Sequence, residues 1–326
     1  MRQLIFESQR KLAFREAAIP VVGPNQALLR TLVTGISAGT EGMWWNGTAT
    51  ALRTGRKSYP YFPGYELVGE VVKVGEEFQG LAPGDRVFAM KPHADHALLT
   101  PNDIWFRLPA DFPLERALGI ALTGTSLHAI HRSGMTVGSS CAVVGLGVLG
   151  LCLVQVLASG MSAPVIAVTN DERKRELART LGAVAALRHD EALPAPWASG
   201  VSTAFDCSGV NSGVATAVKL TADQGTMVAA GFYTQPMELD GEALFSKEMT
   251  IRGVRATGTV GAPNPFNPWT RDATMRLAAD MVFKGRVQND ALITHRIRVE
   301  DARDAYQMVV DKTEPYLQII LDWNVR

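Results

Sequence analysis

The rhythm of hydrophobic and polar positions changes near residue 138. Up to about residue 122, short strand-like runs such as "QALLRTLVTGIS" and "ELVGEVVKVG" alternate with glycine and proline. This pattern predicts a compact unit of β-strands. After residue 138, apolar strand-like runs such as "CAVV" and "PVIAV" each lead into a helix-like segment. Such alternation predicts a doubly wound parallel sheet, with helices covering both of its faces.

A segment rich in proline and asparagine, "NPFNPWTRDA", interrupts this alternation before a final stretch of helix and strand patterns. We therefore expect a β unit at residues 1–122 and 259–326, with an α/β unit at residues 123–258 between its two parts. Active sites in two-domain arrangements of this kind usually lie in the cleft between the domains.

Composition and charge narrow the class of protein. Apolar residues make up 47% of the chain, charged residues make up 20%, and 32 basic side chains balance 32 acidic ones. This is a soluble globular profile that gives no reason to expect a nucleic acid or a membrane as partner. The N-terminus lacks the apolar core of a signal peptide. Cys141, Cys152 and Cys207 are widely spaced and odd in number, so we expect a reducing, cytoplasmic location.

A glycine-rich turn follows the first strand of the α/β unit. Residues 145–150, "GLGVLG", fit G-x-G-x-x-G between the strand "CAVV" and an apolar helix pattern. A structural turn is the alternative, but in a β-α-β context this pattern is typical of dinucleotide binding, because the helix N-terminus offers N–H donors to a pyrophosphate. The expected cofactor-binding residues here are Gly145, Gly147, Val148, Leu149 and Gly150.

The end of the second strand of this unit bears on the choice of cofactor. A carboxylate there would hold the ribose 2′-hydroxyl of NAD, but the strand ends at Thr169 and Asn170. Both side chains can donate hydrogen bonds to a 2′-phosphate, and Arg173 or Lys174 can pair with it. We therefore favour NADP, with NAD still possible because Asp171 lies nearby; a solvated basic helix face is the plainer reading of the two cations.

Other strand ends of the α/β unit are expected to border the same crevice, because the carboxyl ends of parallel strands face the ligand. Cys207 and Ser208 end one strand, and Gly231 and Phe232 end another. Cys207 is expected to pack rather than react. Thr123, at the start of the unit, completes the set of cofactor candidates.

Motifs along essentially the whole chain resemble the medium-chain dehydrogenase/reductase superfamily. They are "PGYELVGEVVKVG" with "GDRV", then "VVGLGVLGLCLVQVLASG", "FDCSG" and "LITHRIRVEDARDAYQMV", in this order. The resemblance implies a GroES-like β domain, a Rossmann domain, a nicotinamide cofactor and an oligomer, for which we expect a homodimer. Within the superfamily, "GISAGTE", "PGYE" and "AGFY" are similar to the bacteriochlorophyllide a dehydrogenase branch.

The resemblance also bears on zinc. Zinc-dependent members have a cysteine where this chain has Ser37 and a histidine where it has Tyr65, and the window of the third ligand holds Gly119, Ile120 and Ala121. A hydroxyl, a phenol and a methyl group do not make a zinc site. The cysteine-rich lobe of the zinc enzymes is also absent, so we expect no metal.

Without zinc, hydrogen-bond donors must stabilise charge on the substrate oxygen. The catalytic candidates are Tyr65, Ser37, Thr40 and His93, with packing or backbone bonding as the plainer role for each hydroxyl. Two adjacent tryptophans are not expected to face one core together, so one of them is expected to line the substrate pocket. The pocket candidates are Trp44, Trp45, Glu66 and Lys91; Glu66 and Glu41 are expected to be structural rather than to transfer protons.

The resulting hypothesis is an NAD(P)-dependent, zinc-independent oxidoreductase that interconverts a secondary alcohol and a ketone of a small-molecule substrate. An NADPH-dependent enoyl or quinone reductase is the alternative, because hydride transfer to a conjugated carbon needs less polarisation of the oxygen. A non-catalytic NADPH-binding sensor is the alternative from another class. The motifs "GISAGTE" and "PGYE" favour the alcohol reaction.

Overall fold

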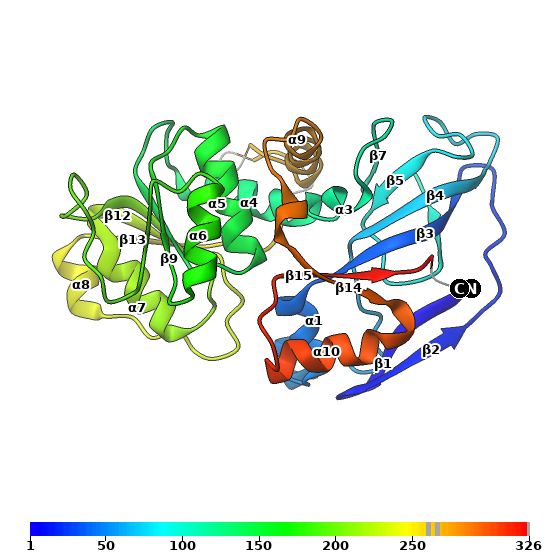
Figure 1. Cartoon of the computed structure of the whole chain (residues 1–326), viewed down its shortest axis with the longest axis horizontal. Helices are drawn as coiled ribbons and strands as arrows, with labels where there is room; N and C mark the ends of the chain where they lie inside the picture. Colours follow the sequence, from blue (N-terminus) through cyan, green and yellow to red (C-terminus); the bar gives the residue numbers. More distant parts are fainter. Residues whose placement is uncertain (259–261, 265–267, 325–326) are drawn as a thin grey trace. The chain divides into compact units, whose positions relative to one another are not determined.

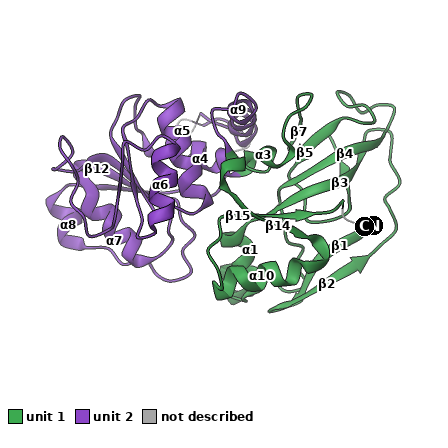
Figure 2. Ribbon diagram, in the orientation of Figure 1, with its two compact units in different colours: residues 1–121, 289–326 green, residues 122–288 purple. Residues whose placement is uncertain are grey.

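The computed structural model of the chain describes residues 1–258, 262–264 and 268–324. The chain folds into two compact units, with residues 1–121 and 289–326 in unit 1 and residues 122–288 in unit 2 (Figure 2). The predicted boundary at 258/259 lies at the edge of the described residues, and residues 265–267 of the predicted connection lie outside them.

Unit 2 contains a parallel sheet with the strand order β10-β9-β8-β11-β12-β13 (Figure 1). Its strands are β8 (Cys141–Val144), β9 (Val165–Val168), β10 (Ala185–Leu187), β11 (Val201–Asp206), β12 (Thr221–Ala229) and β13 (Thr250–Gly253). Each neighbouring pair is parallel. In chain order within the unit this is 3-2-1-4-5-6, the order of dinucleotide-binding Rossmann domains, which confirms the predicted doubly wound sheet.

Helices cover both faces of the unit 2 sheet. They are α4 (Ile120–Ser133), which crosses the unit boundary, α5 (Val148–Gly160), α6 (Glu172–Thr180), α7 (Asn211–Leu220), α8 (Gly241–Ser246) and α9 (Arg271–Phe283). From β8 the chain steps one way across the sheet, and from β11 it steps the other way. Right-handed crossovers therefore put α5 and α6 on one face and α7 and α8 on the other (Figure 1). The residues of β8 and β9 are buried accordingly.

Helix α9 belongs to unit 2, although its sequence position had placed it with the β unit. Its buried positions include Met275 and Met281. The thioether of Met275 lies beside Gly124 of α4, and the methyl group of Met281 lies beside Gly160 of α5. This apolar face of α9 thus packs on the helices of unit 2.

Unit 1 is built on a mainly antiparallel sheet with the order β14-β15-β3-β4-β5-β7, in which β6 also pairs with β3. The strands are β3 (Ala27–Ile36), β4 (Leu67–Val74), β5 (Arg86–Ala89), β6 (His96–Leu99), β7 (Trp105–Arg107), β14 (Ile293–Arg298) and β15 (Gln318–Asp322). Strand β15 pairs with β3, and β14 pairs with β15, which explains how the return segment completes the β unit. Strands β1 (Arg2–Ser8) and β2 (Lys11–Glu16) form a separate antiparallel pair.

The helices of unit 1 are short and serve to close its core. They are α1 (Ala38–Trp45), α2 (Thr50–Arg53), α3 (Leu114–Ala117) and α10 (Ala302–Asp311), with 3-10 turns at Asn289–Leu292 and Val299–Asp301. Helices α1 and α10 lie side by side and enclose a core that includes Phe6, Trp45 and Tyr306 (Figure 1). Within the described residues, no helix combines the length and apolar character needed to cross a membrane.

Candidate functional site

The glycine-rich turn of unit 2 connects β8 to α5. Gly145 has φ +89°, and a Cβ there would lie 2.7 Å from the backbone nitrogen of Ser208. A Cβ on Gly150 would lie 2.1 Å from the carbonyl oxygen of Gly145, so the helix packs tightly on the turn. By contrast, apart from Gly147 itself and its two neighbours in the chain, no described protein atom lies within 4 Å of the position that a Cβ on Gly147 would take. Packing explains the first and third glycines, whereas the second borders open space at the exposed N-terminus of α5.

The turn after β11 is held by a buried carboxylate. Asp206 is fully buried and accepts hydrogen bonds from Ser208 N at 3.0 Å, Ser208 Oγ at 2.6 Å and Tyr233 OH at 2.5 Å. Burial, followed by the hydrogen bond to Asp206, raises the pKa of Tyr233. Residues 207–209 therefore have a fixed course beside the glycine turn.

Two predicted strand ends meet at this edge of the sheet. A Cβ on Gly231 would lie 2.4 Å from Gly209 N, so the turns after β11 and β12 are in backbone contact. Phe232 is 54% exposed, which leaves its ring available to a ligand. Burial raises the pKa of Cys207, so its thiol stays protonated. Thr123 is buried in α4, with its Oγ1 3.3 Å from Cys152 Sγ.

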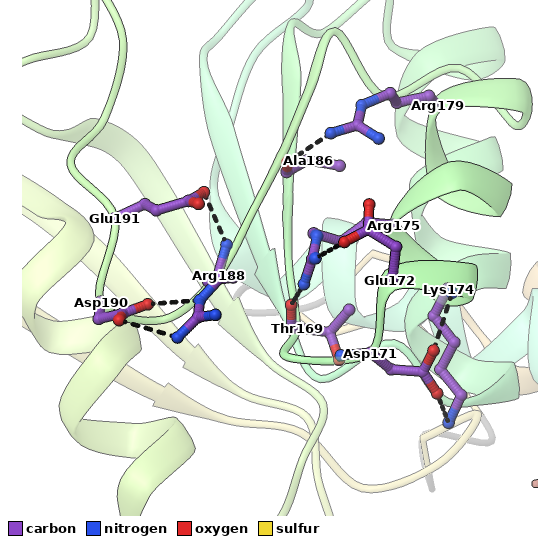
Figure 3. A network of polar contacts seen from close by, with 10 residues as sticks. All are labelled: Thr169, Asp171, Glu172, Lys174, Arg175, Arg179, Ala186, Arg188, Asp190 and Glu191. Carbon is purple, nitrogen blue, oxygen red and sulfur yellow. Dashed lines mark hydrogen bonds and ion pairs between the residues drawn. The ribbon is translucent and has the colours of Figure 1, made fainter.

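The end of β9 carries a polar network that Figure 3 shows. The Thr169 carbonyl accepts a hydrogen bond from Arg175 Nη1 at 2.8 Å, and Arg175 also pairs with Glu172. Asp171 is the N-cap of α6: its Oδ1 accepts from Lys174 N at 3.2 Å, and its Oδ2 lies 3.8 Å from Lys174 Nζ. The Asp171 carboxylate is thus directed to the helix that it caps (Figure 3).

Asn170 and Arg173, also predicted to bind the cofactor, differ in their polar contacts. Asn170 Oδ1 lies 2.5 Å from His189 Nδ1, on the segment that follows β10. Arg173 makes no ion pair with any residue in the described part of the chain. Arg188, by contrast, is engaged by Asp190 at 3.0 Å. The two predicted cations at the start of α6 therefore differ: Lys174 is loosely paired, whereas Arg173 has no ion-pair partner among the described residues.

Unit 1 brings three of its predicted catalytic hydroxyls together. The Tyr65 hydroxyl donates a hydrogen bond to Ser37 Oγ at 2.7 Å, and the nearby Thr40 side chain lowers the pKa of the phenol. Ser37 is the N-cap of α1, and Thr40 lies three residues further along. Residues three apart share one face of a helix, which explains why both reach the same phenol. The cluster of Tyr65, Ser37 and Thr40 is called the hydroxyl cluster below.

Behind the hydroxyl cluster lies a buried set of titratable side chains. Glu41 Oε1 accepts from Ser37 N at 2.8 Å, while its Oε2 accepts from the Tyr306 hydroxyl and lies 3.0 Å from His93 Nε2. Glu41, His93 and Tyr306 are each 0% exposed. His93, predicted as a catalytic residue, is therefore buried against Glu41. We call Glu41, His93 and Tyr306 the buried triad.

The electrostatics of this region favour protonated groups. Burial is the largest cause that raises the pKa of Tyr65, and the charges of Glu66 and Glu41 add to it. The Ser37 and Thr40 side chains lower the pKa of Tyr65 and offset only part of this rise. Burial and the charge of Glu41 also hold the pKa of Glu66 well above its usual range. Within the described residues, Glu66 Oε1 has no hydrogen-bond partner. Tyr65 thus keeps its proton at neutral pH.

The two adjacent tryptophans both face the core of unit 1, so the expectation that only one could do so is wrong. Trp44 is 7% exposed and stacks on Tyr61 with ring centroids 3.8 Å apart. Trp45 is 1% exposed and packs on Tyr306. Consecutive helical residues point about 100° apart, and a short helix enclosed on two sides buries both.

Lys91, predicted to line the substrate pocket, is paired with an acidic side chain of unit 1. Its Nζ forms an ion pair with Asp103 Oδ1 at 2.8 Å, and hydrogen bonding to Lys91 and Thr100 lowers the pKa of Asp103 against the opposing effect of burial. The side chain of Lys91 is 20% exposed. Its positive charge is therefore already matched within unit 1.

The residues at the zinc-ligand positions do not fit a zinc ion. Ser37 and Tyr65 bond to each other, and Ala121 has no ligand atom. The neighbouring His93 and Glu41 are engaged with one another. In residues 1–258, 262–264 and 268–324, no group of three His, Cys, Asp or Glu side chains is arranged to hold a metal ion. The donor chemistry here is that of hydroxyls.

Three residues that organise these sites were not assigned a role from the sequence. Tyr306 occupies an apolar face of α10 together with Ala302, Ala305 and Val309, and a tyrosine in such a place needs a buried partner. Asp206 ends an apolar strand, where a carboxylate must find donors. Arg175, which bonds to the Thr169 carbonyl, is one of three consecutive basic residues in the sequence, and nothing local sets it apart. Tyr306 and Asp206 could have been singled out from the sequence, because each is a polar side chain among the apolar positions of a helix or strand.

Comparisons with known proteins agree with this architecture. The family model described as alcohol dehydrogenase GroES-like domain matches residues 23–104, and the one described as zinc-binding dehydrogenase matches residues 148–271. The second match thus covers the nucleotide-binding half and contains neither Ser37 nor Tyr65.

Similar whole-chain relatives exist. The 2-desacetyl-2-hydroxyethyl bacteriochlorophyllide A dehydrogenase of Rhodobacter capsulatus is 30% identical over 98% of both chains. Sorbitol dehydrogenase of Gallus gallus is 25% identical over 91% of this chain and 89% of its own. The fold is shared with a solved structure of a protein described as a zinc-binding dehydrogenase from Sinorhizobium meliloti 1021 bound to NADP, at TM-score 0.81, 23% identity and 99% coverage of both chains.

With both halves matched by family models and a full-length relative at 30% identity, the chain belongs to the medium-chain dehydrogenase/reductase superfamily.

Proposed function

We propose that this dehydrogenase/reductase uses NADP, works without zinc, and interconverts a secondary alcohol and a ketone. A bound nicotinamide would supply or accept the hydride. Sorbitol and a hydroxyethyl-substituted pigment, the compounds named for two relatives, both carry a secondary hydroxyl group. The substrate class in the proposal is therefore a small molecule with such a group.

The observation that carries the proposal is the hydroxyl cluster at the position of the zinc ligands. Reduction of a ketone places negative charge on its oxygen, and an oriented donor lowers the free energy of that state. Tyr65 is a neutral phenol 2.7 Å from Ser37 Oγ. Both hydroxyls can rotate, so Ser37 can donate to the phenol oxygen while the single phenol proton turns to the substrate oxygen. Because its pKa is raised, Tyr65 would act mainly as a hydrogen-bond donor to the oxygen, since a general acid works best with a pKa near the working pH.

The cofactor half of the proposal rests on unit 2. The open space at Gly147 and the exposed N-terminus of α5 suit a pyrophosphate. At the end of β9, Asp171 is occupied as a helix cap, whereas Thr169, Asn170, Arg173 and Lys174 offer donors and positive charge. These features favour a ribose 2′-phosphate, and hence NADP over NAD.

A panel of alcohols and ketones with both cofactors tests the proposal. The panel contains sorbitol, a secondary aryl alcohol, simple ketones, an enone and a quinone, each with NADP(H) and NAD(H). We expect turnover of at least one secondary alcohol or ketone, with NADP(H) preferred. Turnover of the enone or quinone alone would establish the conjugate-reductase alternative, which a single neutral donor also suits. Tight NADPH binding without any turnover would instead establish the sensor.

The homodimer and the cytoplasmic location also belong to the proposal. Three cysteines with no disulfide among them suit a reducing compartment. Light scattering of the purified protein measures its oligomeric state, and fractionation of the producing cells measures its location. A monomeric mass, or recovery outside the cytoplasm, would contradict these two statements without affecting the catalytic one.

A further inference from the structure

Glu41 is a buried carboxylate whose two oxygens are both engaged. Oε1 accepts from Ser37 N at 2.8 Å, and Oε2 is shared by the Tyr306 hydroxyl and His93 Nε2, the latter at 3.0 Å. A carboxylate removed from water is tolerated only with such partners, and losing them costs far more than at a surface site. A side chain of this kind fixes the groups around it.

The partners of Glu41 come from separate parts of the chain. Ser37 is the N-cap of α1, His93 lies in the loop before β6, and Tyr306, 265 positions from Glu41 in sequence, lies in α10. All are within unit 1. Glu41 therefore ties the first helix of the unit to its last one and to the loop that contains His93.

The position of the Tyr65 hydroxyl depends on Glu41 by two routes, one through Ser37 and one through His93. On one side, Glu41 holds the backbone of Ser37, whose Oγ accepts the Tyr65 hydrogen bond at 2.7 Å. On the other side, His93 N donates to Pro63 O at 2.9 Å, and a Cβ on Gly64 would lie 2.7 Å from the His93 ring. The residues just before Tyr65 therefore rest directly on His93, and the ring of His93 rests on Glu41.

We infer that the buried triad positions the Tyr65 hydroxyl for the reaction, with Glu41 as the residue that joins Ser37 to His93 and Tyr306. Glu41 acts through Ser37 and His93 and is a positioning residue. The inference rests on the proposed function, in which Tyr65 donates a hydrogen bond to the substrate oxygen. Small displacements of such a donor are costly, since a shift of about 1 Å can lower a rate about a hundredfold.

The test combines variants of the triad with Tyr65→Phe in double-mutant cycles, using the panel substrate with the highest turnover. Glu41→Ala is expected to lower kcat about tenfold to a hundredfold, with KM and NADPH affinity nearly unchanged. Glu41→Gln keeps an acceptor for Ser37 N and should recover most of the rate. In the Tyr65→Phe background, Glu41→Ala should change kcat by less than about threefold, because its route of action is already removed.

Tyr306→Phe provides a milder variant should Glu41→Ala fail to fold. It removes one donor from Glu41 Oε2 and should show the same loss of effect in the Tyr65→Phe background. Tyr316→Phe is the matched control, because it removes a hydroxyl bonded to the Val309 carbonyl of the same helix and not to Glu41. Tyr316→Phe should leave kcat unchanged.

The outcomes separate the inference from the function that it rests on. If Tyr65→Phe lowers kcat but the Glu41 and Tyr306 variants are neutral, or their effects multiply with that of Tyr65→Phe, the positioning role is overturned and the proposed function stands. If Tyr65→Phe itself leaves kcat unchanged, or no panel compound turns over, the proposed function fails and the inference fails with it.

Discussion

The Tyr65 hydroxyl donates a 2.7 Å hydrogen bond to Ser37 Oγ, and the family resemblance predicts these two positions to be those of metal ligands in zinc-dependent members. If this phenol stabilises charge on the substrate oxygen, Tyr65→Phe should lower kcat about a hundredfold to a thousandfold, the usual cost of losing one such donor. NADPH affinity should change little, because the cofactor candidates lie in unit 2. Steady-state kinetics and a fluorescence titration with NADPH measure the two quantities.

An unchanged kcat in Tyr65→Phe would leave Tyr65 as a packing residue. Tyr316→Phe serves again as the control, since its hydroxyl bonds to a backbone carbonyl outside the hydroxyl cluster. A comparable loss in both variants would indicate a general effect of removing buried hydroxyl groups.

The glycine turn offers a test that separates binding from stability. Gly147→Ala should fold normally, because open space surrounds the new Cβ in the described structure, yet it should weaken NADPH binding at least about tenfold. Gly150→Ala should instead lower the free energy of unfolding by about 1–3 kcal/mol, because its Cβ would meet the Gly145 carbonyl at 2.1 Å. Thermal melts and NADPH titrations of both variants decide this.

The reverse pattern would contradict the reading of the turn. A destabilised Gly147→Ala would mean that packing requires this glycine. Normal NADPH affinity in a well-folded Gly147→Ala would remove the pyrophosphate from this site.

Much of the fold could be predicted from the sequence, because short stretches of residues determine its turns and strand ends. The glycine turn and the strand ends at Thr169 and Ser208 are properties of short segments. The expected loss of metal ligands at Ser37 and Tyr65 also rests on short motifs, and it stays a prediction. The buried triad was not predictable, because Glu41 and Tyr306 meet only after the chain returns through α10. The burial of both tryptophans likewise depends on α10, which packs against α1.

The basic residues at the start of α6 allow a test of cofactor preference. Lys174→Ala should raise the Kd for NADPH by about tenfold and leave that for NADH nearly unchanged, because only NADPH has the 2′-phosphate. Lys284→Ala is a matched control: this lysine also pairs with a nearby aspartate, at 2.8 Å, but lies at the C-cap of α9. Fluorescence titrations with both cofactors provide the measurement.

Equal weakening of NADPH and NADH in Lys174→Ala would exclude the phosphate contact. In that case Arg173→Ala becomes the informative variant, since Arg173 makes no ion pair among the described residues.

His131 predicts a pH dependence of stability in unit 2. Burial, and then the charge of His128, lower the pKa of His131 from 6.5 to about 4. The unfolded chain therefore binds a proton that the folded chain does not between these values, so stability is lost as the pH falls from about 6.5 towards 4. One pKa unit corresponds to about 1.36 kcal/mol, and the partial exposure of the ring reduces the expected loss to about 1–2 kcal/mol.

The variant His131→Phe isolates this effect. It keeps a ring stacked on Trp269, where the two centroids lie 4.0 Å apart, and removes the titrating nitrogens. Urea unfolding between pH 8 and pH 4.5 should show that the wild type loses more stability than the variant below about pH 6.5, with a constant difference above it. Parallel curves throughout the range would refute the assignment.

Metal analysis tests whether hydroxyls alone serve the reaction. Ser37 and Tyr65, at two of the expected ligand positions, bond to each other, and the window expected for the third ligand, residues 119–121, has no ligand side chain. Purified protein should therefore contain far less than one zinc per chain, and incubation with a chelator should leave kcat unchanged. A zinc-dependent dehydrogenase treated in parallel shows that the chelator removes a catalytic ion. Stoichiometric zinc together with loss of activity on chelation would overturn the metal-free mechanism, and Tyr65 would then have to be read as a neighbour of the ion rather than its replacement.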